Sequence, residues 1–375
     1  MRFVIPSSLL SAHLQTIGRV IVQKNTLPIL DCFKFETSGL QLTITASDSD
    51  STMVTVLPME ECDADISFAV NAKTLQDAIK ELPEQPLEFY VHGETLEVTI
   101  CYQNGQYKIM GQDALDYPVP AENDEETVKL TVPAEQLLSG LSRAMVAAAN
   151  DVLRPQLNTV CFDLKGNDLS LVSSNGNQLA LTTIKGVNTE GKEGTFLLAT
   201  RIAGLLRGML AKQNENVTFE LGSRGAVFST SEYHLTCRLI EGRYPNYRSV
   251  IPHDNSNVVK VDRAGFISML RRILVFANPG IVLVKLALQQ GSLQVSTQYV
   301  DFGRSAEETM LCDYTGNPMH IAFKGNTLLD LVQHIDGDEL SLSLSDPSRA
   351  GVIMPVEQKE GEEVLMLLMP SVFNG

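Results

Sequence analysis

The feature that most constrains this chain is an apolar helical pattern that returns six times at nearly constant intervals. Leu10, Leu14 and Ile17 have the i, i+4, i+7 spacing of one buried helix face. The same spacing begins again at Leu75, Leu137, Ile202, Phe266 and Leu328, at intervals of 65, 62, 65, 64 and 62 residues. One apolar helical face is common, but six at regular spacing indicate internal repetition. We therefore expect six half-units, arranged as three similar domains.

The segments around these helices also repeat. A short strand-like run precedes each helix, and about three further strands follow it; Asn104-Gly105, between two such runs, is a strong hairpin signal. The expected helices are 7–24, 73–81, 133–154, 200–212, 262–276 and 325–335, and the expected leading strands are 2–5, 66–70, 129–132, 195–198, 258–261 and 320–323. The predicted fold class is α+β, with each half-unit built as strand, helix and three strands.

Two polar, turn-rich segments divide the chain into thirds. Residues 118–127 contain proline, asparagine and an acidic run, and residues 252–257 read Pro-His-Asp-Asn-Ser-Asn. A chain of 375 residues is long enough for two or three domains. We expect an N-terminal domain over 1–125, a central domain over 126–252 and a C-terminal domain over 253–375.

Charge is distributed unevenly between the predicted helices and the rest of the chain. The net charge is −16, yet the six helical segments together carry +6 and the remainder −22. If all helices lie on one side of a continuous sheet, that side is basic or neutral and attracts phosphate, while the acidic side repels stray DNA. Pseudo-sixfold repetition favours a closed ring with helices inside and sheets outside. Three similar units in a row leave unlike ends, which can close a ring with a second chain.

Composition excludes several other classes. The chain has no apolar run of 18 residues and no signal peptide at its N-terminus, so neither a membrane protein nor a secreted one is expected. Its six cysteines stand at 32, 62, 101, 161, 237 and 312, without any Cys-x-x-Cys pair. We interpret them as reduced, small apolar residues of a cytoplasmic protein.

Motifs for catalysis and metal binding are missing. The sequence has no phosphate-binding Gly-x-x-x-x-Gly-Lys loop, no Gly-x-Ser-x-Gly elbow and no His-Glu-x-x-His. Its six histidines are scattered without metal-ligand spacing. Asp336-Gly337-Asp338 is interpreted as a turn and Asp48-Ser49-Asp50 as a strand end rather than as metal sites. We expect no catalytic residue, no metal and no cofactor.

Over its whole length the sequence resembles the beta subunit of bacterial DNA polymerase III, the DNA sliding clamp. The segments that carry the resemblance are Lys24-Asn25-Thr26-Leu27-Pro28-Ile29-Leu30, Arg154-Pro155-Gln156-Leu157-Asn158, Glu241-Gly242-Arg243-Tyr244-Pro245-Asn246-Tyr247 and Leu368-Met369-Pro370. The resemblance implies a head-to-tail homodimer of three-domain chains, whose twelve helices line a hole around duplex DNA without sequence preference. It also implies a non-catalytic role: tethering the replicative polymerase catalytic subunit, the clamp loader and other proteins with a clamp-binding motif.

The resemblance implies positions for DNA contact and for the dimer interface. The DNA-contacting positions are Lys24, Lys73, Asn150, Arg201 and Arg207. Lys24 stands where the family usually has arginine, which keeps the charge but loses the bidentate geometry. At the dimer interface Tyr107 is expected to meet Ile273 and Leu274. Ile273 also lies on the repeated helix face, so Leu274 is the better interface candidate.

The resemblance further implies an apolar groove that receives a short peptide with Leu, Phe and Gln anchors. Its matching positions are Arg154, Leu157, Gly176, Leu179, Pro245, Val250, Leu367, Leu368, Met369, Pro370, Ser371 and Phe373. Departures occur at Asn175–Gln178, at Ser249 and in the tail after Pro370, so the preferred peptide can differ from the usual one. The alternatives are an accessory or mobile-element clamp, and more remotely a non-DNA repeat scaffold or hydrolase.

Overall fold

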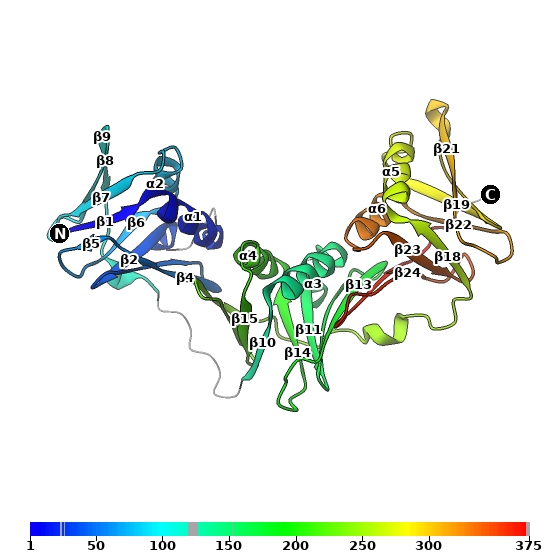
Figure 1. Cartoon of the computed structure of the whole chain (residues 1–375), viewed down its shortest axis with the longest axis horizontal. Coiled ribbons are helices and arrows are strands. Elements are labelled where there is room, and N and C mark those ends of the chain that lie inside the picture. Colours follow the sequence, from blue (N-terminus) through cyan, green and yellow to red (C-terminus); the bar gives the residue numbers. More distant parts are fainter. Residues whose placement is uncertain (23–24, 26, 119–126, 152, 373–375) are drawn as a thin grey trace. The chain divides into compact units, whose positions relative to one another are not determined.

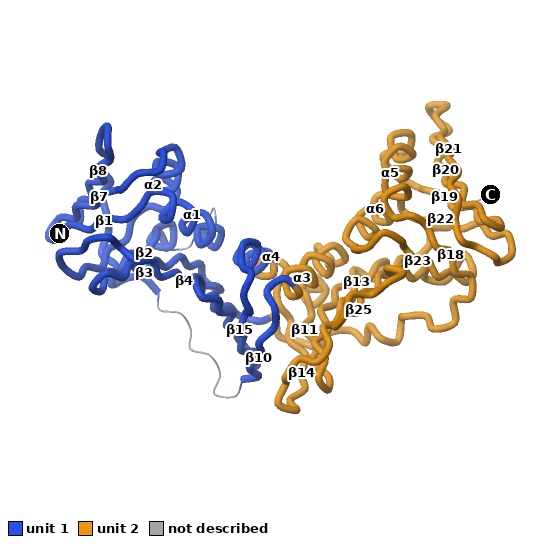
Figure 2. The backbone as a smooth tube through the Cα atoms, in the orientation of Figure 1, with its two compact units in different colours: residues 1–135, 204–239 blue, residues 136–203, 240–375 orange. Residues whose placement is uncertain are grey.

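The computed structural model describes residues 1–22, 25, 27–118, 127–151 and 153–372. The chain forms two compact units, residues 1–135 with 204–239, and residues 136–203 with 240–375 (Figure 2). Helices α3 (Ala134–Ala147) and α4 (Thr200–Leu210) each contain a point where the chain passes from one unit to the other. Two of the expected site residues, Lys24 and Phe373, lie outside the described residues, as does most of the predicted linker near 125.

Unit 1 contains two antiparallel sheets and helices α1 (Ser7–Ile17) and α2 (Ala72–Ile79) (Figure 1). The five-stranded sheet has the order β5 (Glu61–Cys62), β1 (Arg2–Pro6), β7 (Pro86–Val91), β8 (Glu97–Tyr102), β9 (Gly105–Met110). The eight-stranded sheet has the order β10 (Val128–Pro133), β15 (Asn216–Leu221), β16 (Gly225–Ser229), β17 (Tyr233–Arg238), β4 (Ser51–Pro58), β3 (Gln41–Ser47), β2 (Cys32–Ser38), β6 (Ser67–Asn71).

Unit 2 repeats this plan with helices α5 (Arg263–Leu274) and α6 (Gly325–Gln333). Its eight-stranded sheet has the order β14 (Gly194–Ala199), β11 (Thr159–Lys165), β12 (Asp168–Ser174), β13 (Gln178–Lys185), β25 (Glu362–Leu368), β24 (Gly351–Pro355), β23 (Glu339–Leu344), β18 (Asn257–Asp262). Its four-stranded sheet has the order β21 (Arg304–Leu311), β20 (Ser292–Tyr299), β19 (Leu283–Gln289), β22 (Met319–Lys324).

Each eight-stranded sheet has a seam where strands of the predicted central domain meet strands of a neighbouring domain. In unit 1, β17 pairs with β4, and Leu235 lies opposite Met53. In unit 2, β13 pairs with β25, and Leu179 lies opposite Leu367. The strands of the central domain are therefore divided between the two units.

The expected half-unit pattern is confirmed: each of the six helices directly follows a strand, and the repeated apolar faces are buried. Leu10, Leu14 and Ile17 are 0% exposed, as are Phe266 and Leu270. Burying each such side chain contributes about 1.5–3 kcal/mol before ordering costs. Side-chain caps define two of the helix starts, because Asn71 accepts from the Thr74 amide at 2.9 Å and Asp262 from the Gly265 amide at 2.6 Å.

All six expected helices are shorter than predicted, α1 and α3 by the most. Helix α1 ends at Ile17 and continues as a 3-10 turn over Gly18–Val20 instead of reaching residue 24. Helix α3 ends at Ala147 rather than near 154, and a separate 3-10 turn forms at Pro155–Leu157. The second difference has a local cause, since asparagine and aspartate favour turns and proline can begin a helix but not continue one.

In unit 2, the helices pack closely enough to require a glycine. A Cβ at Gly325, the first residue of α6, would lie 2.5 Å from Leu274 Cδ2 and 2.6 Å from Val284 Cγ2. Arg263, at the start of α5, donates to the carbonyls of Val332 (3.3 Å) and Gln333 (3.0 Å), the last residues of α6. A guanidinium at a helix C-terminus satisfies free carbonyls and complements the helix dipole.

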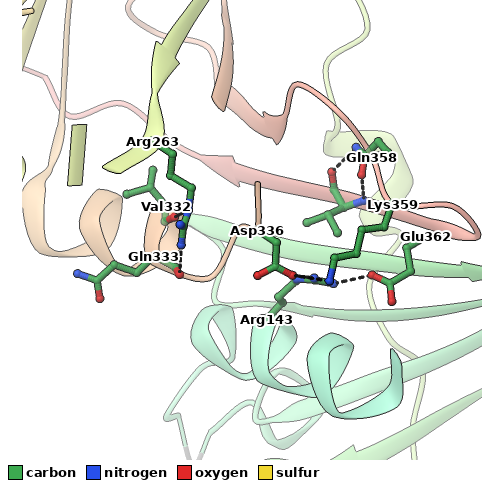
Figure 3. A network of polar contacts seen from close by, with 9 residues as sticks. Arg143, Arg263, Val332, Gln333, Asp336, Gln358, Lys359 and Glu362 are labelled. Atoms are coloured by element: carbon green, nitrogen blue, oxygen red, sulfur yellow. Dashed lines mark hydrogen bonds and ion pairs between the residues drawn. The ribbon is translucent and has the colours of Figure 1, made fainter. Parts of the chain in front are cut away.

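An ionic group with a buried centre joins α3 to the C-terminal domain within unit 2 (Figure 3). We call Arg143, Asp336, Lys359 and Glu362 the Arg143 cluster. Arg143 is 3% exposed and donates to Glu362 on β25 at 3.1 Å and to Asp336, after α6, at 2.5 Å. Lys359 lies 3.5 Å from the same Asp336 carboxylate. The cluster lines a cavity of about 430 Å³. The bend at Asp336-Gly337-Asp338 agrees with the expected turn, with Gly337 at φ +99°.

Candidate functional site

Several residues expected in the peptide groove lie together in one apolar cluster of unit 2. Leu157, Leu179 and Leu367 share this cluster and are at most 9% exposed. The backbone brings them together: Leu179 on β13 is the partner of Leu367 on β25, and the carbonyl of Leu157 accepts from the Ala149 amide at 3.0 Å. We call this set, with Leu197, Tyr244 and Tyr247, the groove cluster.

Four other groove candidates form exposed positions on the segments that contribute to this cluster. Val250 is 56% exposed, and Arg154, Gly176 and Pro245 are exposed as well. Arg154 donates to Asp151 at 2.8 Å, which fixes one side of its guanidinium. Gly176 has φ +93°, a conformation that L side chains rarely adopt, in the turn between β12 and β13.

The tail ends its strand where the sequence predicts. Strand β25 stops at Leu368, before Pro370, and the backbone is then held by other contacts. The Met369 amide donates to Asn177 at 2.8 Å, and the Ser371 amide donates to Ala322 at 2.8 Å. Met369 is 39% exposed, and Pro370 and Ser371 are partly exposed. An apolar chain end beyond the ladder thus presents surface beside Asn177.

Leu368 does not join the groove cluster. Side chains alternate between the two faces of a strand, so neighbours on β25 point into different cores. Leu367 packs in the groove cluster, whereas Leu368 is 2% exposed in the core that contains Phe266 and Leu270 of α5. The structure therefore assigns Leu368 to the interior of unit 2 rather than to a surface beside Leu367.

Sequence reasoning missed a polar group beside the groove cluster. Asp163 on β11 accepts from Tyr247 Oη at 2.7 Å, pairs with Arg248, and accepts from Thr195 Oγ1 at 3.3 Å. The Arg248 guanidinium also stacks 4.7 Å from the centroid of the Tyr247 ring. Burial raises the pKa of Tyr247 above its usual value, and the Asp163 carboxylate adds to this shift. The signal in the sequence was an acidic residue within the apolar run Val160–Leu164.

The four expected DNA-contacting residues that the structure describes occupy exposed positions at or near the helices. Lys73 lies in α2, Arg201 and Arg207 lie in α4, and Asn150 follows α3. Lys73 and Arg207 belong to unit 1, and Arg201 and Asn150 to unit 2.

The expected dimer residues differ in exposure. Ile273 is 0% exposed and belongs to the core of unit 2, while Leu274 and Tyr107 are partly exposed. Tyr107 lies on β9, an edge strand of its sheet, and its ring packs at a tilt against Tyr102, with 4.9 Å between centroids. Strand β21 is likewise an edge strand of its sheet. Within the described residues, both strands therefore leave one side of their backbone unpaired.

The described part of the chain has no group of three or more His, Cys, Asp or Glu side chains that could hold a metal ion. The cysteines at all six positions are free. The cavity beside the Arg143 cluster is not lined by any groove, DNA or dimer candidate that the structure describes. In the described residues, no helix is long and apolar enough to span a membrane.

Comparisons with known proteins cover the chain almost from end to end. Three family models match: the N-terminal domain of the DNA polymerase III beta subunit at residues 1–121, its central domain at 131–246 and its C-terminal domain at 248–369. The beta sliding clamp of Pseudomonas aeruginosa is 23% identical over 98% of this chain and 99% of its own. That of Bacillus subtilis is 23% identical over 99% of both chains. The solved DNA polymerase III subunit beta of P. aeruginosa superposes with a TM-score of 0.91, at 22% identity and full coverage of both chains.

Proposed function

Because the chain belongs to the DNA polymerase III beta subunit family, we propose that it is a DNA sliding clamp that encircles duplex DNA and holds a polymerase on it. The observation that carries this proposal is the match of three successive domain models to a chain built from six repeated helix-bearing half-units. The role requires no catalytic group, metal or cofactor. It requires a ring, a surface tolerant of any DNA sequence and a docking site for partners.

The proposed ring forms from two chains joined head to tail. Support comes from the two unlike edges, β9 in the N-terminal domain and β21 in the C-terminal domain, which suit a heterologous contact. Apolar residues are exposed at both edges, with Met110 64% and Leu311 87% exposed. We place Tyr107 and Leu274 in this interface. Leu274→Glu should give monomers by burying an unpaired charge, whereas Val56→Glu, on an exposed position of β4, should leave dimers intact.

The proposed DNA contacts are loose phosphate contacts from Lys24, Lys73, Asn150, Arg201 and Arg207. Loose contacts suit a sliding ring, because hydrogen bonds to base edges would bind it to particular sequences. Replacing Lys73, Arg201 and Arg207 by alanine should weaken binding equally on unrelated sequences. Each lost phosphate contact should reduce the slope of log K against log salt by about 0.9. A change in sequence preference with an unchanged slope would contradict the assignment.

The proposed partner site is the groove cluster with its exposed neighbours Arg154, Pro245, Val250 and the tail from Met369. Apolar anchors of a peptide gain about 1.5–3 kcal/mol each on full burial, before ordering costs. This suits exchange of the polymerase catalytic subunit, the clamp loader and other proteins on one ring. Deleting residues 369–375 should abolish peptide binding while dimers persist, as measured by light scattering.

The deciding experiment is topological. With a clamp loader, the protein should remain on nicked circular DNA and be lost after the circle is linearised. The matched control is the Leu274→Glu variant, which we expect not to close a ring and to be retained on neither substrate. Equal retention of the unmodified protein on circular and linear DNA would contradict encirclement.

A further inference from the structure

Asp163 is the one acidic residue of β11, a strand buried on both faces. Six of the seven residues of β11 are buried, and Asp163 is 9% exposed. A carboxylate in such a place is tolerated only where donors compensate the loss of water. The donors here come from two directions: Thr195, on the adjacent strand β14, and two successive residues of the chain, Tyr247 and Arg248.

Those two residues begin the 3-10 turn Tyr247–Val250, which ends at an expected groove position. Tyr247 is 7% exposed within the groove cluster, so its ring fixes the start of the turn from one side while Asp163 holds its hydroxyl. The Arg248 guanidinium binds the same carboxylate and covers the Tyr247 ring. One carboxylate thus restrains two consecutive side chains of the turn.

The other contacts of the turn are weaker or local. Ser249 Oγ donates to the carbonyl of Asn246 at 2.7 Å, and the Ile251 amide donates to the carbonyl of Arg248 at 3.4 Å. Val250 is 56% exposed, so little packing holds it in place. Ile251, the residue after the turn, packs against the groove cluster. Val250 therefore lies between that contact and the first two residues of the turn, whose side chains Asp163 holds.

We propose that Asp163 is a positioning residue for partner binding: it holds the 3-10 turn so that Val250 and Pro245 form a preorganised wall for the apolar anchors of a partner peptide. This inference rests on the proposed function, because it deepens the partner site placed at the groove cluster. Asp163 itself does not touch the peptide. Because the turn is already ordered, it loses less conformational entropy when the peptide binds.

The test is a double-mutant cycle between Asp163 and Val250, with binding of a fluorescent peptide carrying Gln, Leu and Phe anchors as the readout. Asp163→Asn keeps the shape of the side chain but removes its charge, and should weaken binding about tenfold. Val250→Ala should weaken binding by a similar factor in the unmodified protein and by less than about twofold in the Asp163→Asn background. If the double variant weakens peptide binding by the product of the two single factors, the two residues act independently and the proposal is wrong.

Two further variants separate positioning from general stability. Asp163→Glu keeps the carboxylate and should recover part of the affinity. Asp168→Asn, on the neighbouring strand β12, removes a carboxylate that makes no side-chain hydrogen bond or ion pair among the described residues, and should bind as the unmodified protein does. In Asp163→Asn, amide hydrogen exchange should accelerate over residues 244–251 and stay unchanged in α5. Uniform acceleration throughout unit 2 would overturn a positioning role.

The same binding measurements distinguish a failure of the proposed partner site from a failure of the positioning role of Asp163. If the unmodified protein does not bind the peptide, the proposed partner site fails, and the positioning role fails with it. If it binds and Asp163→Asn binds equally well, only the positioning role fails.

Discussion

Units 1 and 2 solve the same structural problem with different chemistry. In each unit, strands of the central domain pair with strands of a neighbouring domain, and side-chain contacts link a helix of one domain to the other domain. Unit 1 uses neutral groups. Thr55 Oγ1 donates its one proton to the carbonyl of Glu232 at 2.8 Å, so it accepts from His13 Nδ1 on α1, which lies 2.8 Å away. The Tyr233 ring stacks on His13 with 5.0 Å between centroids. Unit 2 uses the charged Arg143 cluster.

The difference predicts distinct responses to substitution and to acid. A buried ion pair contributes little beyond what apolar groups of the same size would give, but losing one partner leaves a charge stranded in the interior. Removing one member of a neutral hydrogen-bonded group lowers the free energy of unfolding by less. A buried imidazole in such a group, however, resists protonation. The comparison between the two seams can therefore be tested with substitutions and pH.

The largest effect is expected from Arg143→Met. It leaves the Glu362 carboxylate, 6% exposed, without its guanidinium, and should lower the free energy of unfolding of unit 2 by about 3–5 kcal/mol. Denaturant unfolding followed by a probe in unit 2 measures this. The control, Arg143→Met with Glu362→Leu, removes both charges and should recover most of the loss. A single variant within about 1 kcal/mol of the unmodified protein would show that water reaches Glu362.

A smaller loss is expected from His13→Ala in unit 1. The substitution removes the donor to Thr55 Oγ1 and the ring that stacks on Tyr233, and should cost about 1–3 kcal/mol. The same denaturant experiment, with a probe in unit 1, provides the measurement. A loss larger than that of Arg143→Met would reverse the proposed contrast between neutral and charged seams.

Mild acid should affect the two seams differently. Burial lowers the pKa of His13, while the charge of Glu232 opposes this shift. The unfolded chain therefore binds the proton more readily, and stability from neutral His13 is complete above the unfolded pKa of about 6.5 and is lost as pH falls below it. Burial also lowers the pKa of His234 on β17. Between pH 7 and pH 5 the free energy of unfolding of unit 1 should fall, and His13→Asn should make this fall smaller.

The pairing of Asp336 with Arg143 should respond only at lower pH. Burial raises the pKa of Asp336, but the hydrogen bond and charge of Arg143, with Lys359, outweigh it and leave the pKa below its ordinary value. Its contribution is present above the unfolded pKa of about 3.9 and disappears as pH falls through the lower folded pKa. If the free energy of unfolding falls as much in unit 2 as in unit 1 between pH 7 and pH 5, this contrast is wrong.

The smallest effect is expected from Asp336→Asn. The side chain is 52% exposed, so solvent screens its pairing with Arg143 and Lys359. We expect a loss of about 1 kcal/mol or less in unit 2. A loss as large as that of Arg143→Met would mean that Asp336, rather than Glu362, is the principal counter-ion.

Periodicity in the sequence predicted the repeated elements because each helix face and each leading strand is a local pattern. The missing amide of Pro370 predicted the end of the final strand. The resemblance placed Leu368 in the groove, whereas the pairing of β25 with β13 directs it into the core beneath α5, which no local pattern indicates. The Arg143 cluster joins residues 219 positions apart, so no local pattern could indicate it. Asp163 was visible as an acid within an apolar run, but its partners were not.

The division of the central domain between two sheets has a consequence for the order of synthesis. Strand β13 is made midway along the chain, yet its neighbour β25 is the last strand made. Until then, the central half of the unit 2 sheet has an open apolar edge that other chains can pair with. A nascent chain truncated before residue 362 should therefore be a target for chaperones and prone to aggregation, although it already contains α1 to α6 of the described residues.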